Sequence, residues 1–117
     1  MPIAFIFAYM KKVLVCAHDP MLVKSLYGVL RGEGLTVDMT EHLSQAVRMI
    51  MEDRYEAVII HSGPFGLQAE DAVQIIKAVA PGLPLLVTGK YGPGAEALNI
   101  EEPVDLEEFK QAIHAIL

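Results

Sequence analysis

Cysteine and tryptophan are nearly absent from this chain of 117 residues, which has one cysteine, Cys16, and no tryptophan. A single cysteine excludes an intramolecular disulfide framework and any zinc site built from cysteines. This cysteine usage is typical of proteins from a reducing compartment, so we expect a cytoplasmic protein. Cys16 itself lies in an apolar run, where burial would raise the pKa of its thiol and leave it unreactive.

Positive charge is also scarce. Nine Lys and Arg stand against fifteen Asp and Glu, which gives a net charge of -6 at pH 7. The basic residues do not cluster along the chain, so a phosphate backbone would be repelled. Nucleic acid is therefore excluded as an expected partner.

No hydrophobic run is long enough to cross a membrane. The apolar stretch 2–10 stops at Lys11 and Lys12, whereas a transmembrane helix needs about 20 apolar residues. No basic residue precedes the stretch, so it lacks the first region of a signal peptide. We expect residues 1–11 to be an extra apolar arm before one soluble domain, residues 12–117, with no membrane partner.

Five short apolar segments in the rest of the chain have the pattern of strands. Three of them read as strands buried on both faces, one alternates like an edge strand, and one is a short fifth strand. They are residues 13–16, 57–60 and 85–88, then 35–39, then 98–100. Buried strands of this kind favour a parallel sheet.

Helical periodicity fills most of the gaps between these strands. Helices are predicted after the cap Asp19-Pro20, around 46–51, over 70–80, and from Asp105, where Glu108 completes a capping box. Their apolar stripes are expected to face the sheet. These stripes include three residues near helix ends. Several methionines are expected to fill gaps in the core, with a binding surface as the second possibility. The three are Met51, Val79 and Leu106, and the methionines include Met21, Met39, Met49 and Met51.

One connection is too short for a helix. Only residues 89–96, with three glycines and a proline, separate the fourth strand from the fifth, and a helical crossover needs at least about 10–12 residues. The order of elements therefore predicts an α/β fold with an open, mostly parallel sheet. Its fourth helix is missing or shortened, and the sheet beside the last two strands is left partly uncovered.

Four segments, residues 13–20, 55–61, 83–88 and 102–109, carry a likeness to a known family. In their spacing, more than in their identities, residues 12–117 resemble a response regulator receiver domain, the phosphoacceptor module of two-component signalling. The resemblance implies a flavodoxin-like fold, an open parallel five-stranded sheet of order 2-1-3-4-5 with helices on both faces. It also implies a site at the carboxyl ends of the first and third strands.

The chain departs from that family at the positions that bind Mg²⁺ and accept the phosphoryl group. Where the family has an acidic pair for Mg²⁺, this chain has Ala17 and His18, with Asp19 one step beyond. A hard cation has thus lost its carboxylate ligands. The phosphoacceptor aspartate corresponds to His61, which cannot form an acyl phosphate.

The remaining family positions differ as well. The lysine that pairs with the phosphoryl group corresponds to Glu102, a reversal of charge, and the aromatic residue of the signalling switch corresponds to Asn99. Only Thr88, at the Ser/Thr position after the fourth strand, still matches. The expectation is a phosphorylation-independent, receiver-like protein-interaction module in signal transduction, with a protein partner and no cofactor.

A metal-binding role is one alternative. His18 and His61 end neighbouring strands about 4.8 Å apart, so they should meet, and Asp19 and Glu102 approach the same crevice. Two imidazoles and one or two carboxylates would suit zinc or another transition metal. The competing interpretation is that the histidines fill a pocket emptied of phosphate chemistry, while Asp19 only caps its helix.

A small α/β enzyme with its site in the crevice between the first and third strands is the second alternative. An enzyme should show a deep pocket with converging perturbed groups, whereas a binding module should show an apolar surface patch or a self-association interface. The apolar arm must pack against something if it is ordered. We expect it to cover the sheet beside strands four and five, on its own subunit or on a second one in a homodimer.

Overall fold

The computed structural model describes residues 11–62, 69–90 and 97–117, which form five strands and four helices. The strands are β1 (Lys12–Cys16), β2 (Thr36–Thr40), β3 (Ala57–His61), β4 (Leu85–Thr88) and β5 (Leu98–Ile100). The helices are α2 (Pro20–Gly32), α3 (Leu43–Glu52), α4 (Ala69–Val79) and α5 (Leu106–Ile116). Every strand pair is parallel and the order is β2-β1-β3-β4-β5. The predicted flavodoxin-like α/β fold is confirmed.

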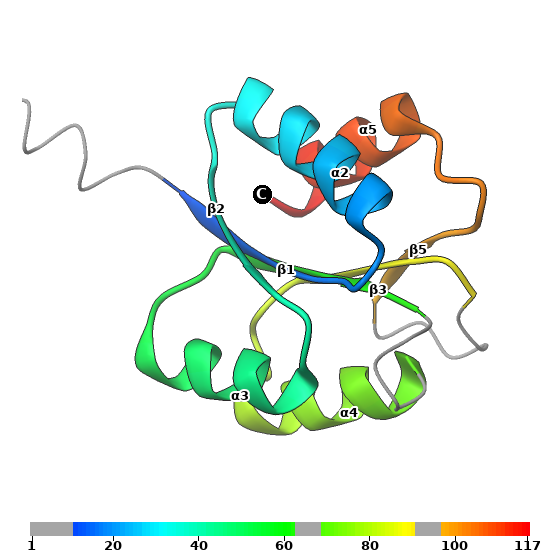
Figure 1. Ribbon diagram of the computed structural model, residues 1–117. Coiled ribbons are helices and arrows are strands. Elements are labelled where there is room, and N and C mark those ends of the chain that lie inside the picture. Colours follow the sequence, from blue (N-terminus) through cyan, green and yellow to red (C-terminus); the bar gives the residue numbers. More distant parts are fainter. Residues whose placement is uncertain (1–10, 63–68, 91–96) are drawn as a thin grey trace, which may run out of the picture.

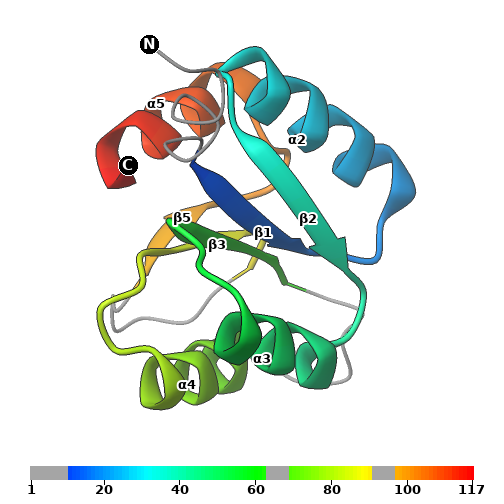
Figure 2. The ribbon, with the colours of Figure 1, turned by 90° about the vertical axis from the view of Figure 1, so that its left-hand side faces the viewer.

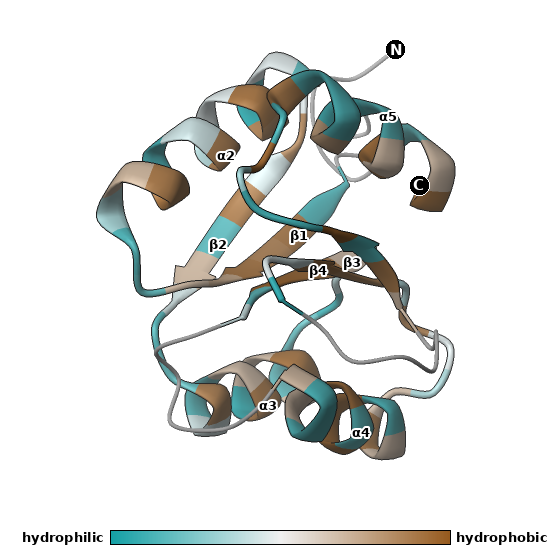
Figure 3. Cartoon of the chain, turned by 90° about the vertical axis from the view of Figure 1, so that its right-hand side faces the viewer, coloured by the Kyte–Doolittle hydropathy of each residue, from teal (hydrophilic) through white to brown (hydrophobic). Residues whose placement is uncertain are grey.

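The sheet separates two layers of helices, α2 with α5 on one face and α3 with α4 on the other (Figure 1). Successive residues of a strand point to opposite faces. Val13 and Val15 therefore pack in the cluster beneath α2 and α5, whereas Leu14 and Cys16 pack in the cluster beneath α3 and α4. Figure 3 shows the central strands as apolar segments between the two helical layers.

Side-chain caps start two of the helices, as the sequence predicted. The Asp19 carboxylate accepts hydrogen bonds from the backbone N–H groups of Met21 (3.0 Å) and Leu22 (3.2 Å), with Pro20 in the first turn of α2. Asp105 accepts from the backbone N–H of Glu108 at 3.0 Å and so starts α5. Each cap satisfies N–H groups that have no partner inside the helix.

The described residues of the connection between β4 and β5 agree with the predicted loss of the fourth helix. Residues 89, 90 and 97 are not helical, and residues 91–96 lie outside the described residues. The apolar arm, residues 1–10, lies outside them too. No helix in the three described segments is long and apolar enough to cross a bilayer.

The expected core role of the methionines is wrong for three of them. Met21, Met39 and Met51 have exposed fractions of 76%, 46% and 71%, and only Met49 packs partly buried against the core. Val79 and Leu106, also expected on buried faces, are exposed as well. Four of these residues lie in the first or last turn of a helix, and Met39 lies in the edge strand β2, so fewer elements surround them than surround residues in the middle of the fold.

Candidate functional site

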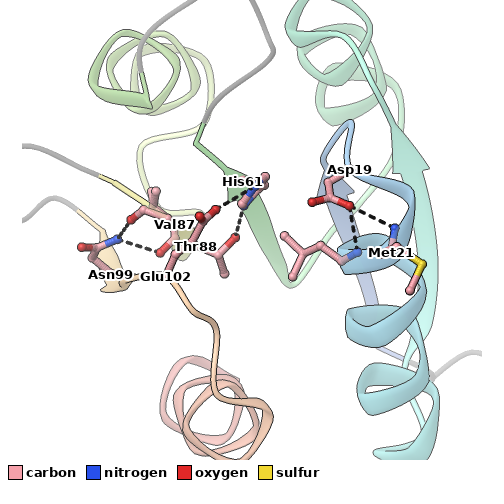
Figure 4. Close-up of polar contacts among 9 residues, drawn as sticks. Asp19, Met21, His61, Val87, Thr88, Asn99 and Glu102 are labelled. Carbon is pink, nitrogen blue, oxygen red and sulfur yellow. Dashed lines mark hydrogen bonds and ion pairs between the residues drawn. The ribbon is translucent and has the colours of Figure 1, made fainter.

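His61 is the last residue of β3, and its imidazole is buried at the carboxyl end of the sheet. Its Nδ1 lies 3.0 Å from the Thr88 hydroxyl oxygen, and its Nε2 lies 3.2 Å from Oε1 of Glu102 (Figure 4). Thr88 ends β4, and Glu102 lies between β5 and α5. One side chain therefore connects three segments that are distant in sequence.

Gly89 makes room for this contact. Its φ of +93° is a conformation that residues with a side chain rarely adopt. A Cβ atom here would lie 3.3 Å from Cβ of Ser62 and 3.4 Å from both Cε1 of His61 and Oε1 of Glu102. The backbone N–H of Gly89 donates to the Ile100 carbonyl at 2.8 Å. A glycine at this position thus lets the chain after β4 pass close to the His61 and Glu102 side chains.

Asn99 acts as a clamp between β4 and β5. Its side-chain Nδ2 donates to the backbone carbonyls of Val87 and Gly89, both at 2.9 Å. The sequence marked Asn99 only as a substituted switch position. Its role in closing the sheet beside the His61 contact could not be predicted, because it depends on the register between two strands.

The contacts of Thr88, His61 and Glu102 place a hydroxyl, an imidazole and a carboxylate in a row. The same order activates a nucleophile in hydrolases. Thr88, however, has no exposed surface, so a substrate carbonyl cannot reach its oxygen. The Glu102 side chain is 59% exposed, and it borders a hollow of about 270 Å³ that Lys90 and Glu101 also line. The geometry supports a structural link rather than acyl transfer.

The structure gives His18 a different partner from the one expected. Its Nδ1 lies 3.5 Å from Oε2 of Glu41, just beyond β2, and half of its side chain is exposed. The carboxylate of Asp19 is engaged with the start of α2. His18 therefore turns toward the β2 side, whereas His61 turns toward β4, and Figure 4 shows Asp19 well away from His61.

The proposed metal ligands do not come together as a set. Of His18, Asp19, His61 and Glu102, only His61 and Glu102 are in contact. In residues 11–62, 69–90 and 97–117 there is no group of three or more His, Cys, Asp or Glu side chains that could hold a metal ion. Cys16 is buried, which raises the pKa of its thiol to about 12, so it is protonated and inert as predicted.

An apolar groove of about 480 Å³ lies beside His18, between α2 and the end of β2. Val23, Tyr27 and Met39 line it, and Lys24 and Glu41 lie among its polar residues. The groove could not be predicted from the sequence, because the alternation of residues 35–39 favours a buried Met39. Exposed apolar surface of this kind typically marks an interaction site.

Comparisons with known proteins agree on the fold. No protein-family model and no curated protein matches the chain. Among solved structures, the chain has the fold of the response regulator receiver (CheY-like) domains. The receiver domain protein of Methanospirillum hungatei is 16% identical, with a TM-score of 0.79 and coverage of 91% of this chain and 92% of that one.

Two further structures show the same likeness. The response regulator TrrA of Thermotoga maritima, solved in complex with Mg²⁺ and BeF, is 19% identical, with a TM-score of 0.81 and coverage of 92% of this chain and 100% of that one. The chemotaxis response regulator CheY4 of Vibrio cholerae is 16% identical, with a TM-score of 0.78 and coverage of 92% and 99%. The TM-scores establish the shared fold, and at identities this low the function must be argued from the residues of this chain.

Proposed function

We propose that this chain is a receiver-like protein-interaction module that works in the cytoplasm without phosphorylation. One observation carries the proposal, namely the contact of His61 with Thr88 and Glu102 at 3.0 and 3.2 Å. By the family resemblance, these positions would hold the phosphoacceptor aspartate, the Ser/Thr and the lysine. Imidazole and carboxylate here replace carboxylate and ammonium, so the two positions still hold a pair of contacting side chains, with the carboxylate at position 102 instead of position 61.

The chemistry of these residues supports the absence of phosphotransfer. An acyl phosphate needs a carboxylate at position 61, and the Glu102 carboxylate would repel a phosphoryl group placed there. Mg²⁺ prefers oxygen ligands, which the side chain of Ala17 lacks altogether and that of His18 replaces with nitrogen. The nearby carboxylate, Asp19, already accepts two backbone N–H groups.

The His61 imidazole also supports a single fixed state of the site. It connects Thr88 and Glu102 through ordinary side-chain contacts, where the family would place a phosphoryl group between the corresponding residues. A link made by the chain itself does not depend on a donor of phosphate. The module would then bind its partner constitutively.

The shape of the surface favours a protein partner over a substrate. The groove at α2 and β2 is mostly apolar. Cys16 and Tyr55, whose pKa values are raised by burial, do not line it. Perturbed groups converging in a deep pocket are typical of enzymes, and exposed apolar patches are typical of binding surfaces. A partner in a signalling system of the two-component type is what the receiver fold suggests.

Beryllofluoride and acetyl phosphate test the proposal. With Mg²⁺ present, neither should raise the melting temperature of this protein, and acetyl phosphate should leave its intact mass unchanged. TrrA, whose structure contains Mg²⁺ and BeF, is the positive control in the same assay. A phosphorylated species, or stabilisation by beryllofluoride that depends on Mg²⁺, would refute the proposal.

A further inference from the structure

No strand of the described residues pairs with the outer side of β2, which is therefore called the free edge of β2 below (Figure 2). Thr36 donates its N–H to the Lys11 carbonyl, and Thr40 accepts from the N–H of Ala17, so these residues point their backbone groups toward β1. Because backbone groups alternate in direction along a strand, those of Val37 and Met39 point outward. An exposed edge of this kind is a template for another strand.

The apolar groove continues from this edge. The side chains of Val37 and Met39 lie on the α2 face of the sheet. Val37 packs against the core, and Met39 lines the groove together with Val23 and Tyr27. Met39 and Tyr27 are exposed by 46% and 39%. A strand added to β2 would therefore bury its α2-facing side chains on Met39 and Tyr27.

Residues 3–9 have the pattern that such a strand needs. Large side chains occupy every second position, namely Ile3, Phe5, Phe7 and Tyr9, and two of the three positions between them are alanine. Residues 1–10 carry no charged side chain. Alternation with period two is typical of a strand that buries one face.

We propose that residues 3–9 of one chain pair with the free edge of β2 in a second copy of this chain and bury their large side chains in its apolar groove, in place of the site beside β4 and β5 that the sequence suggested. Each copy donates one arm and accepts one, so the exchange closes as a symmetric dimer.

The length of the arm argues for a second copy over the same chain. Lys11 is held against Thr36 at the start of β1, and a strand paired with the outer edge of β2 would lie two strand spacings from β1, about 9.6 Å. The two residues from Tyr9 to Lys11 span at most about 7 Å. An arm paired as far as Tyr9 therefore cannot reach the β2 edge of its own chain.

The hollow at the other end of the sheet fits the arm less well. It has a volume of about 430 Å³ and lies beside Asp53, Arg54 and Glu56. Those charged side chains would lose water to an uncharged segment that offers them no partner. The groove at β2 offers both apolar side chains and unpaired backbone groups.

Sedimentation equilibrium of the full chain measures the proposed dimer. We expect twice the monomer mass for the wild type, and the monomer mass after deletion of residues 1–9. Met39→Glu places a charge in the groove and should weaken the dimer about tenfold or more in Kd. Met51→Glu is the matched control, because Met51 is an exposed methionine of α3 on the far side of the sheet, and it should leave the dimer intact.

A monomeric wild type, a dimer that survives the deletion, or equal effects of the two methionine variants would overturn the proposal. Circular dichroism of each variant checks that it is folded. If Met39→Glu does not fold, cross-linking decides the question without it.

Cross-linking identifies which chain donates the arm. A chain with Phe7→Cys is mixed with a chain carrying Met39→Cys and treated with a short bis-maleimide, which tolerates a shift of register. Cys16 is buried with a raised thiol pKa, so it does not compete. A covalent product joining the two different chains is expected. If a chain that carries both Phe7→Cys and Met39→Cys yields only an internally linked monomer, the arm binds its own chain and the proposal fails.

Discussion

His61 has almost no accessible surface, yet both ring nitrogens have polar partners, Thr88 and Glu102. Of these partners, Thr88 is fully buried and Glu102 is largely exposed. Loss of the imidazole would leave the buried hydroxyl without its partner, whereas Glu102 would turn to water. The stability lost on replacing His61 should therefore come mainly from the unsatisfied hydroxyl of Thr88.

Valine substitutions at these two positions separate the hydrogen bond from the packing. His61→Val should lower the free energy of unfolding by about 1–3 kcal/mol, because a buried hydroxyl is left unsatisfied. Adding Thr88→Val should cost less than its effect in the wild type, since both polar partners are then gone. Urea denaturation measures all three variants. Simple additivity of the two single effects would show that the hydroxyl and the imidazole are not coupled.

Two glycines provide a matched pair for testing backbone conformation. Gly89→Ala should destabilise the fold by about 1 kcal/mol or more, because its φ is +93° and its Cβ would crowd His61 and Glu102. Gly28→Ala, in the exposed interior of α2 with nothing within 4 Å of the new Cβ, should stabilise by about 0.5–1 kcal/mol. Thermal unfolding of both variants measures the two changes in stability. Changes of the same sign would contradict the prediction.

At the scale of elements, charged side chains join segments that the hydrophobic core also holds. The Lys12 ammonium binds Asp53 and lies 3.5 Å from Asp38, and the Tyr55 hydroxyl donates to Asp38 at 2.7 Å. The hydrogen bond to Asp53, with the nearby charge of Asp38, raises the pKa of Lys12. This group ties the start of β1 to β2 and to the segment between α3 and β3.

A second ionic group joins α2 to α5 and gives a pH-dependent prediction. Glu33, just after α2, lies 3.1 Å from His114 and 3.6 Å from Lys110, and the hydrogen bond from His114 lowers its pKa. A carboxyl group with a lowered pKa contributes stability above its unfolded value, about 4.3, and loses it as the pH falls through the folded value.

Glu33→Gln should therefore flatten the loss of stability below about pH 4.3. The urea midpoint measured across that acid range checks this, with Glu52→Gln at the exposed end of α3 as the control. High salt should reduce the difference, because the ion pair is at the surface. An unchanged acid slope in Glu33→Gln would show that the link between α2 and α5 is not ionic.

For the whole molecule, net charge determines how association responds to salt. Two copies that each carry -6 repel one another, and salt screens that repulsion. The arm that joins them in the proposed dimer has no charged residue, so salt removes no attraction there. The dimer Kd should fall when sodium chloride is raised, as sedimentation at two salt concentrations would show. Weaker association at high salt would indicate an interface built from ion pairs.

Features that depend on neighbouring residues could be predicted from the sequence. The apolar runs at 13–16 and 57–60, the caps at Asp19 and Asp105 and the short connection after Thr88 together defined the α/β fold. The strand order came from the family resemblance carried by the same segments. Each of these signals is local, because periodicity and capping involve residues within a few positions of each other.

Which side chains meet, and which reach solvent, was decided by the tertiary structure. His61 and Glu102 were recognised as site residues, but their contact joins residues 41 positions apart in sequence. His18 faces Glu41 instead of His61, because a side chain at a strand end can turn to either neighbouring strand. The periodicity of Met39 is that of a buried residue, and it is exposed because no described strand or helix covers the outer edge of β2. A one-dimensional pattern records the face on which a residue lies, whereas its burial depends on which element the fold places beside it.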